Sequence, residues 1–192
     1  MFQVIFFGGY LSTQQDIDSW IHSAVQQEPT IKFRGWPFPK GVGAGDVLPV
    51  KAYRNLILSL AKEVVTTPDD FIIVGHSSGC AIANEVAAIS LSSTTKQNTR
   101  LVVLDGFTPN AHIRKQMKFT CWSAKCGVHH SRNWNAMRLT ENFKFIESPN
   151  CQISPWCLHF SLVNKNATEN TVKRITQGYN NCKANLMWLK EV

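Results

Sequence analysis

Residues 72 to 85 read IIVGHSSGCAIANE, and this stretch decides the fold. It opens with a short apolar, β-branched run at residues 72–74, which is typical of a buried strand. A Gly-His-Ser-Ser-Gly turn follows at residues 75–79. Residues 81–88 then have the composition and spacing of a helix. The order strand, turn, helix places Ser77 in the turn itself.

The two glycines around Ser77 suggest why a serine stands at this turn. Glycine lets the strand and the helix approach each other closely, and so sharp a turn exposes the serine hydroxyl. The helix that follows points unpaired N–H groups and its positive end toward the same place, where they would stabilise an oxyanion. We therefore predict that Ser77 is a nucleophile and that the backbone N–H of Ser78 is an oxyanion donor. A packed connection or a phosphate cradle is the alternative interpretation.

The rest of the chain alternates between strand and helix patterns and predicts one α/β domain spanning residues 1–192, with no internal repeat. The sheet is expected to be mainly parallel, with helices on both faces. An irregular, lid-like insertion is predicted at residues 107–156, where aromatics, cysteines, histidines and prolines mix without a period. The predicted strands are 4–7, 30–33, 71–75, 100–105, 158–163 and 184–189, and the predicted helices besides the one after Ser77 are 16–27, 48–66 and 168–178.

Three strand ends are predicted to meet at one edge, because the loops that follow parallel strands converge. They carry Tyr10, Ser77 and Asp105. The N–H of Tyr10 is predicted to be the second oxyanion donor. Asp105 could hold a histidine in the correct tautomer and stabilise the imidazolium that forms when Ser77 loses its proton. A turn cap in the Asp-Gly pair is the alternative role for Asp105.

Three motifs together resemble the α/β-hydrolase superfamily: FFGGY, GHSSG followed by AIANEVA, and VVLDGFTP. The motifs fall within residues 4–10 and 72–109, and the order of elements is similar throughout. The chain looks like the compact serine hydrolases and the thioesterase domains of that superfamily. This resemblance implies a Ser-His-acid enzyme that cleaves a small acyl ester or thioester through an acyl-enzyme, without a metal or another cofactor.

The chain departs from the resembled families at the acid and at the base. In the compact hydrolases the acid follows the penultimate strand, where this chain has Asn164-Lys165-Asn166, so the acid role moves to Asp105. In both families a histidine follows the last strand, but here the sequence MWLKEV ends at Val192.

The missing base must come from another histidine, because a serine without a base is a poor nucleophile. His159 falls within a predicted apolar strand, about 16 Å before its carboxyl end at 3.3 Å per residue, which argues for a buried structural role. His130 is our predicted base, since it lies in the predicted insertion and can reach the strand-end cleft. If no histidine completes the site, the chain is a catalytically silent hydrolase fold that serves as a binding or interaction module.

Composition limits the other classes of function. The 192 residues are 44% apolar and 17% charged, which suits one globular domain. The net charge is +7, but lysine and arginine are scattered, which predicts a solvated basic surface and no nucleic-acid partner. The sequence does not decide whether the chain binds a protein partner. No apolar run is long enough to span a membrane, and the opening MFQVIFFGGYL is interpreted as a strand and not a signal peptide, which favours a cytoplasmic location.

Five of the six cysteines lie after residue 120. The pairs Cys121/Cys126 and Cys151/Cys157 lack the usual C-x2-C spacing of zinc sites, so no metal is predicted. Disulfides in an oxidising compartment and small core thiols are the two remaining interpretations, and the sequence leaves the pairing open.

Overall fold

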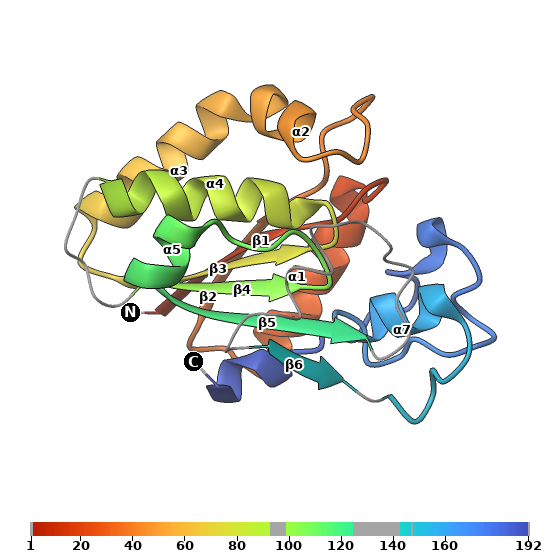
Figure 1. Cartoon of the computed structure of the whole chain (residues 1–192). Coiled ribbons are helices and arrows are strands. Elements are labelled where there is room, and N and C mark those ends of the chain that lie inside the picture. Colours follow the sequence, from red (N-terminus) through yellow and green to blue (C-terminus); the bar gives the residue numbers. More distant parts are fainter. Residues whose placement is uncertain (1, 93–98, 125–142, 147, 192) are drawn as a thin grey trace.

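A computed structural model describes all residues except 1, 93–98, 125–142, 147 and 192 (Figure 1). Its centre is a six-stranded sheet of order β2-β1-β3-β4-β5-β6, and every neighbouring pair is parallel. The strands are β1 (Phe2–Phe7), β2 (Lys32–Trp36), β3 (Asp70–His76), β4 (Arg100–Leu104), β5 (Lys118–Ala124) and β6 (Phe143–Ile146). The predicted α/β fold with a mainly parallel sheet is confirmed.

Both faces of the sheet are covered, as the apolar character of its strands requires. Val4 and Phe6 pack into a core with α1, whereas Ile5 and Phe7 point to the opposite core with α3 and α4. Figure 1 shows α3, α4 and α5 together on one side of the sheet. The helices are α1 (Gln14–Gln27), α2 (Val47–Ala52), α3 (Arg54–Thr66), α4 (Gly79–Ser92), α5 (Ala111–Gln116), α7 (Pro155–Ser161), and the 3-10 turns η1 (Ile175–Gln177) and η2 (Met187–Glu191).

The direction of winding reverses between β1 and β3. The chain passes from β1 outward to β2, and then returns to build β3, β4, β5 and β6 on the other side of β1. Ligands of open parallel sheets bind where the order of the strands reverses, beyond the carboxyl ends of the strands. The loop after β1 and the turn after β3 meet at this place, and these segments contain Tyr10 and Ser77.

The predicted strand 158–163 does not form: residues 158–161 belong to the helix α7, and residues 162 and 163 form a turn. Ser154 caps α7 by accepting a hydrogen bond from the N–H of Cys157, and Pro155 occupies the first turn. A short apolar run suits a buried helix as well as a buried strand, and the Ser-Pro start decides between them.

The described part of the predicted insertion, residues 107–156, is largely regular. It contains α5 and two further strands of the main sheet, because β5 pairs with β4 and β6 pairs with β5. The expected lid is therefore wrong for residues 111–124 and 143–146, while residues 125–142 lie outside the described part.

Three further boundaries differ from the prediction. The expected helix 48–66 is two helices, α2 and α3, which meet at Tyr53. The expected helix 168–178 has only the short η1, and the expected strand 184–189 has an isolated bridge between Asn164 and Ala184 followed by η2. These C-terminal segments pack onto the α1 face of the sheet through residues such as Trp188.

The glycine that follows the Ser77 turn is required by close packing. A Cβ at Gly79 would lie 2.5 Å from the carbonyl oxygens of both Phe7 and Gly8. We expect Gly79→Ala to lower the free energy of unfolding by about 1–3 kcal/mol or more, because two backbone segments would have to separate. Urea denaturation measures this loss. Gly43→Ala is the matched control, since a Cβ there meets nothing within 4 Å, and an equal loss in both variants would contradict the packing argument.

Candidate active site

Ser77 stands in strained backbone between β3 and α4. Its φ is 54°, a left-handed value that residues other than glycine seldom adopt. The N–H of Ser77 donates to the carbonyl oxygen of Leu104 at 2.9 Å, which fastens the turn to the end of β4. A Cβ at Gly9 would lie 2.8 Å from the Cβ of Ser77 and 3.4 Å from its hydroxyl oxygen. The loop after β1 therefore lies directly against the serine side chain.

Asp105 follows β4 with the same unusual backbone. Its φ is 51°, and its N–H donates to the carbonyl oxygen of Trp122 at 2.7 Å. Leu11, in the loop after β1, has a φ of 66°. Left-handed residues other than glycine thus occur after three neighbouring strands at the same edge. Strain of this kind is concentrated at functional sites, so the edge is the candidate site.

Among the contacts within the described residues, His159 on α7 meets Asp105. The distance from its Nδ1 to Oδ2 of Asp105 is 2.6 Å, and the two side chains are 1% and 0% exposed. A carboxylate only accepts hydrogen bonds, so Nδ1 carries the proton and Nε2 is the acceptor nitrogen of the neutral ring. Oδ1 of Asp105 accepts a second hydrogen bond, at 2.8 Å, from the hydroxyl of buried Ser123 on β5.

His76, which directly precedes Ser77, connects the serine turn to α7. Its ring lies 4.4 Å from the ring of His159, and its Nε2 donates to the backbone carbonyl of His159 at 3.2 Å. The hydroxyl of Tyr179 lies 3.4 Å from Nδ1 of His76. Burial raises the pKa of Tyr179 well above its usual range, so this hydroxyl stays protonated and can donate. These contacts keep His159 beside the residue next to Ser77.

The structure thus brings together some of the predicted site residues. Ser77 and Asp105 lie at the same edge of the sheet, whereas His130 lies outside the described residues. The argument that His159 is too far from this edge was wrong, because it assumed a strand where the chain forms α7. Figure 1 shows α7 beyond the arrowheads of the strands, which is the side on which their carboxyl ends lie. The Ser154-Pro155 pair is the sequence signal that could have indicated this helix.

The two predicted oxyanion donors lie on the segments that meet at this edge. Tyr10 follows Gly9, which contacts Ser77, and Ser78 immediately precedes α4. The hydroxyl of Ser78 donates to the carbonyl oxygen of Ala44 at 3.1 Å, which ties the loop before α2 to the site.

A cavity of about 440 Å³ lies between the loops after β1 and β2, and its lining includes Tyr10 but not Ser77, Asp105 or His159. Its lining includes Tyr10, Leu11 and Phe38, and the ring of Phe38 packs edge-on against Tyr10 with centroids 5.7 Å apart. Tyr10 and Phe38 are the aromatic residues of its lining. Trp36 and Trp122, by contrast, pack with the two cores.

The described part of the chain contains neither a metal-binding cluster nor a membrane-spanning helix. There, no group of three or more His, Cys, Asp and Glu side chains is arranged to hold a metal ion. Among the helices formed by the described residues, none has the length and apolar character needed to cross a membrane.

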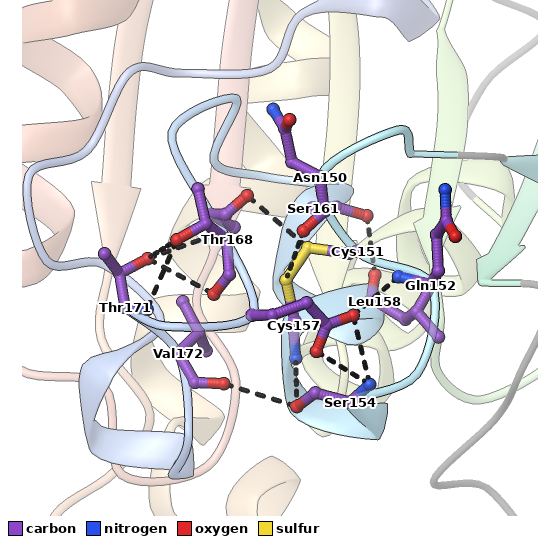
Figure 2. The surroundings of a disulfide bond; sticks show 12 residues. Asn150, Cys151, Gln152, Ser154, Cys157, Leu158, Ser161, Thr168, Thr171 and Val172 are labelled. Carbon is purple, nitrogen blue, oxygen red and sulfur yellow. Dashed lines mark hydrogen bonds between the residues drawn. A yellow bond between two sulfur atoms is a disulfide. The ribbon is translucent and has the colours of Figure 1, made fainter.

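One disulfide is present in the segment that leads into α7. Cys151 and Cys157 are bonded, with their Cα atoms 5.3 Å apart, and both side chains are buried (Figure 2). The same segment is held by the carboxylate of Glu169, which accepts hydrogen bonds from the N–H groups of Gln152, Ile153 and Ser154.

The all-parallel sheet with helices on both faces and the reversal of winding at β1 and β3 define a doubly wound α/β fold, with the serine turn at the carboxyl edge of its strands. No family model and no curated protein matches the chain, and the solved structures that match it do so at low sequence identity. The RedJ thioesterase of prodiginine biosynthesis from Streptomyces coelicolor is 14% identical, with a TM-score of 0.47 over 74% of this chain and 78% of that one. A putative YdeN-like hydrolase from Pectobacterium atrosepticum is 12% identical, with a TM-score of 0.42 over 76% of each chain. An extracellular α/β-hydrolase from a Paenibacillus species is 11% identical, with a TM-score of 0.45 over 93% of this chain and 66% of that one. All three TM-scores are below 0.5, so these likenesses lead to no conclusion about the fold or the chemistry of this chain.

The hydrogen bond from Ser123 to Asp105 should contribute to stability. Ser123→Ala would leave one carboxylate oxygen of a buried acid without this donor, so we expect a loss of about 1–3 kcal/mol in the free energy of unfolding. Ser90→Ala is the matched control, since Ser90 is also buried but donates to a neutral carbonyl within α4, and it should lose at most about 1 kcal/mol. Guanidinium denaturation of both variants makes the comparison. Equal losses would show that the carboxylate does not depend on Ser123.

Glu169 should make the segment before α7 sensitive to acid. Hydrogen bonds from backbone N–H groups, with that of Ile153 first, lower the pKa of Glu169 below its usual range. Its contribution to stability is therefore present above the ordinary glutamate pKa, about 4.3, and is lost as the pH falls through the lowered value. We expect the melting temperature of Glu169→Gln to fall less steeply than that of the wild type as the pH decreases through this range. Glu28→Gln, which alters an exposed carboxylate at the end of α1, should show the same fall as the wild type. Identical curves for wild type and Glu169→Gln would contradict this role.

Proposed function

We propose that the protein is a serine hydrolase that cleaves a small acyl ester or thioester through an acyl-enzyme on Ser77. The observation that carries the proposal is the buried 2.6 Å hydrogen bond between His159 and Asp105, next to the strained serine turn. A buried histidine with one nitrogen fixed by a carboxylate is the arrangement that orients a general base. In this proposal Ser77 is the nucleophile, His159 is the base and Asp105 is the orienting acid.

The assignment of the base to His159 replaces the expectation of His130. His159 has a defined partner in Asp105 and lies against His76, the neighbour of Ser77. Within the described part of the chain the hydroxyl of Ser77 makes no hydrogen bond. We therefore propose that this hydroxyl approaches Nε2 of His159 during the reaction. Hydrogen bonds of this kind are often long in free enzymes and tighten when substrate binds.

The reaction follows from these roles. Nε2 of His159 takes the hydroxyl proton of Ser77 while the oxygen attacks the carbonyl carbon of the substrate. The N–H groups of Tyr10 and Ser78 stabilise the oxyanion of the tetrahedral intermediate. As the intermediate collapses, His159 returns the proton to the leaving alcohol or thiol, and the acyl group remains on Ser77. Water, deprotonated by His159, then releases the acid and restores the serine.

The cavity beside Tyr10 supports the proposal that the substrate carries an apolar acyl group of modest size. Its volume of about 440 Å³ falls within the range of small-molecule sites, and Leu11 and Phe38 give it apolar walls. Lys40 also lines it and could interact with an anionic leaving group. A small acyl ester or thioester with a polar leaving group suits this lining better than a long, wholly apolar lipid.

Active-site labelling tests the proposal directly. We expect a fluorophosphonate probe to modify Ser77 in the wild type, and Ser77→Ala to be unlabelled and inactive toward short acyl esters with its melting temperature nearly unchanged. His159→Gln should lower kcat by roughly 10²–10⁴-fold, because general base catalysis is lost. His22→Gln, which changes an exposed histidine of α1, should keep full activity.

Two results would contradict different parts of the proposal. No labelling of folded wild type would favour the catalytically silent binding module. Labelling that survives His159→Gln but is lost in His130→Ala would keep the hydrolase and refute the assignment of the base.

A further inference from the structure

The covalent link in the segment before α7 lies very close to the proposed base. The Cys151–Cys157 disulfide closes a short loop, and Cys157 already belongs to α7. His159 is only two residues beyond Cys157 in the same helix. Figure 2 shows the disulfide between the start of α7 and the segment at Thr168 and Val172. The disulfide therefore fixes the start of the helix that carries His159.

The loop closed by the disulfide is exposed at Ile153 and is attached to the domain mainly through Glu169. Ile153 is 82% exposed, and the loop is held to the domain by the Glu169 carboxylate, which accepts from the N–H of Gln152 at 2.6 Å and from that of Ile153 at 2.8 Å. The sulfur of Cys151 also lies 3.4 Å from the carbonyl oxygen of Ala167. Opening of this exposed loop is the route by which a reductant would reach the buried sulfurs.

The helix α7 is too short to persist without such supports. It has seven residues, whereas isolated helices shorter than about 12 residues are marginal in water. Its register determines whether Nδ1 of His159 meets Asp105 and whether the carbonyl of His159 meets His76. A displacement of about 1 Å in a catalytic group can lower a rate by roughly 100-fold.

We propose that the Cys151–Cys157 disulfide, supported by Glu169, is a positioning device for His159, so that its reduction by a dithiol lowers hydrolysis without unfolding the domain. The inference rests on the proposed function of Ser77, Asp105 and His159, and it adds redox control of the same site. The reductant is of the dithiol class, either a small dithiol or a dithiol protein.

The redox step is a thiol–disulfide exchange between the Cys151–Cys157 pair and the two thiols of the reductant. A thiolate of the reductant attacks one sulfur of the Cys151–Cys157 bond and forms a mixed disulfide, and the other cysteine leaves as a thiolate. The second thiolate of the reductant then attacks the mixed disulfide. Cys151 and Cys157 end as two thiols, the dithiol becomes a disulfide, and two electrons and two protons pass to the protein.

Two other cysteines are poor competitors for this exchange. Burial raises the pKa of Cys182 to about 12, and that of Cys80 well above its usual range. Only the thiolate attacks a disulfide, so at neutral pH neither of these cysteines readily exchanges with the Cys151–Cys157 pair. The proposal therefore names an external dithiol, and neither Cys80 nor Cys182, as the reductant.

The test compares oxidised and reduced forms of the same protein. The wild type is reduced with dithiothreitol, freed of reductant under anaerobic conditions, and assayed with a short p-nitrophenyl ester. We expect kcat to fall roughly 10–100-fold with little change in KM, and to recover on reoxidation. Near-UV circular dichroism and thermal melting should show that the reduced domain stays folded. The downfield proton resonance of the His159–Asp105 hydrogen bond should weaken in parallel, which a merely structural disulfide would not cause.

Variants separate positioning from general loss of structure. The double variant Cys151→Ser/Cys157→Ser should have the low kcat of the reduced form and no response to dithiothreitol. Cys182→Ser is the matched control and should respond like the wild type. Glu169→Gln should be reduced faster than the wild type, because the loop over the disulfide loses a charged acceptor.

The outcomes distinguish the two levels of the proposal. A reduced, folded protein with unchanged kcat overturns the positioning role and leaves the hydrolase intact. Unfolding on reduction also overturns it, because the disulfide would then be a general support of the domain. An oxidised wild type without turnover dependent on Ser77 overturns the proposed function itself.

Discussion

The parallel pairing of β1 with β3 is the constraint on which the rest of the molecule depends. It aligns Phe7 with Gly75, so the two strands end side by side. Glycine at position 79 lets α4 start directly against the carbonyl groups of Phe7 and Gly8. The serine turn has no space to relax into ordinary backbone, and the left-handed φ of Ser77 is the result. Close packing at one strand pair thus produces the strained, buried position of the serine.

The C-terminal part of the chain, which lies at the same edge of the sheet, is held in place in a different way. After β6 the described chain forms one short α-helix and two 3-10 turns, and it is fixed by side-chain contacts more than by regular elements. Asn164 donates to the carbonyl oxygens of Gly178 and Asn180, and the ring N–H of Trp20 donates to that of Val163. Hydrogen bonds that join distant segments replace the ladder of a sheet here. They hold α7 in register above the strand ends.

The polar contacts of the site matter for stability because the residues that make them are buried. Asp105 and His76 are fully buried, and His159 is 1% exposed. A buried polar group without a partner is costly, and Asp105 and His76 lie where partners for their polar atoms are present. For Asp105 these include the ring of His159 and the hydroxyl of Ser123. The same contacts that satisfy the core therefore orient a histidine next to the serine turn.

The sequence by itself determined the α/β class, the strand before Ser77, the helix after it, and the edge where Tyr10, Ser77 and Asp105 lie. These features depend on local apolar periodicity and on the geometry of any parallel sheet, which a sequence records directly. The partner of Asp105 could not be obtained in this way. His159 is 54 residues away along the chain, and the apolar run around it fits a helix or a strand equally well. Only the tertiary structure, by capping α7 at Ser154 and holding it over the strand ends, decided which histidine meets the acid.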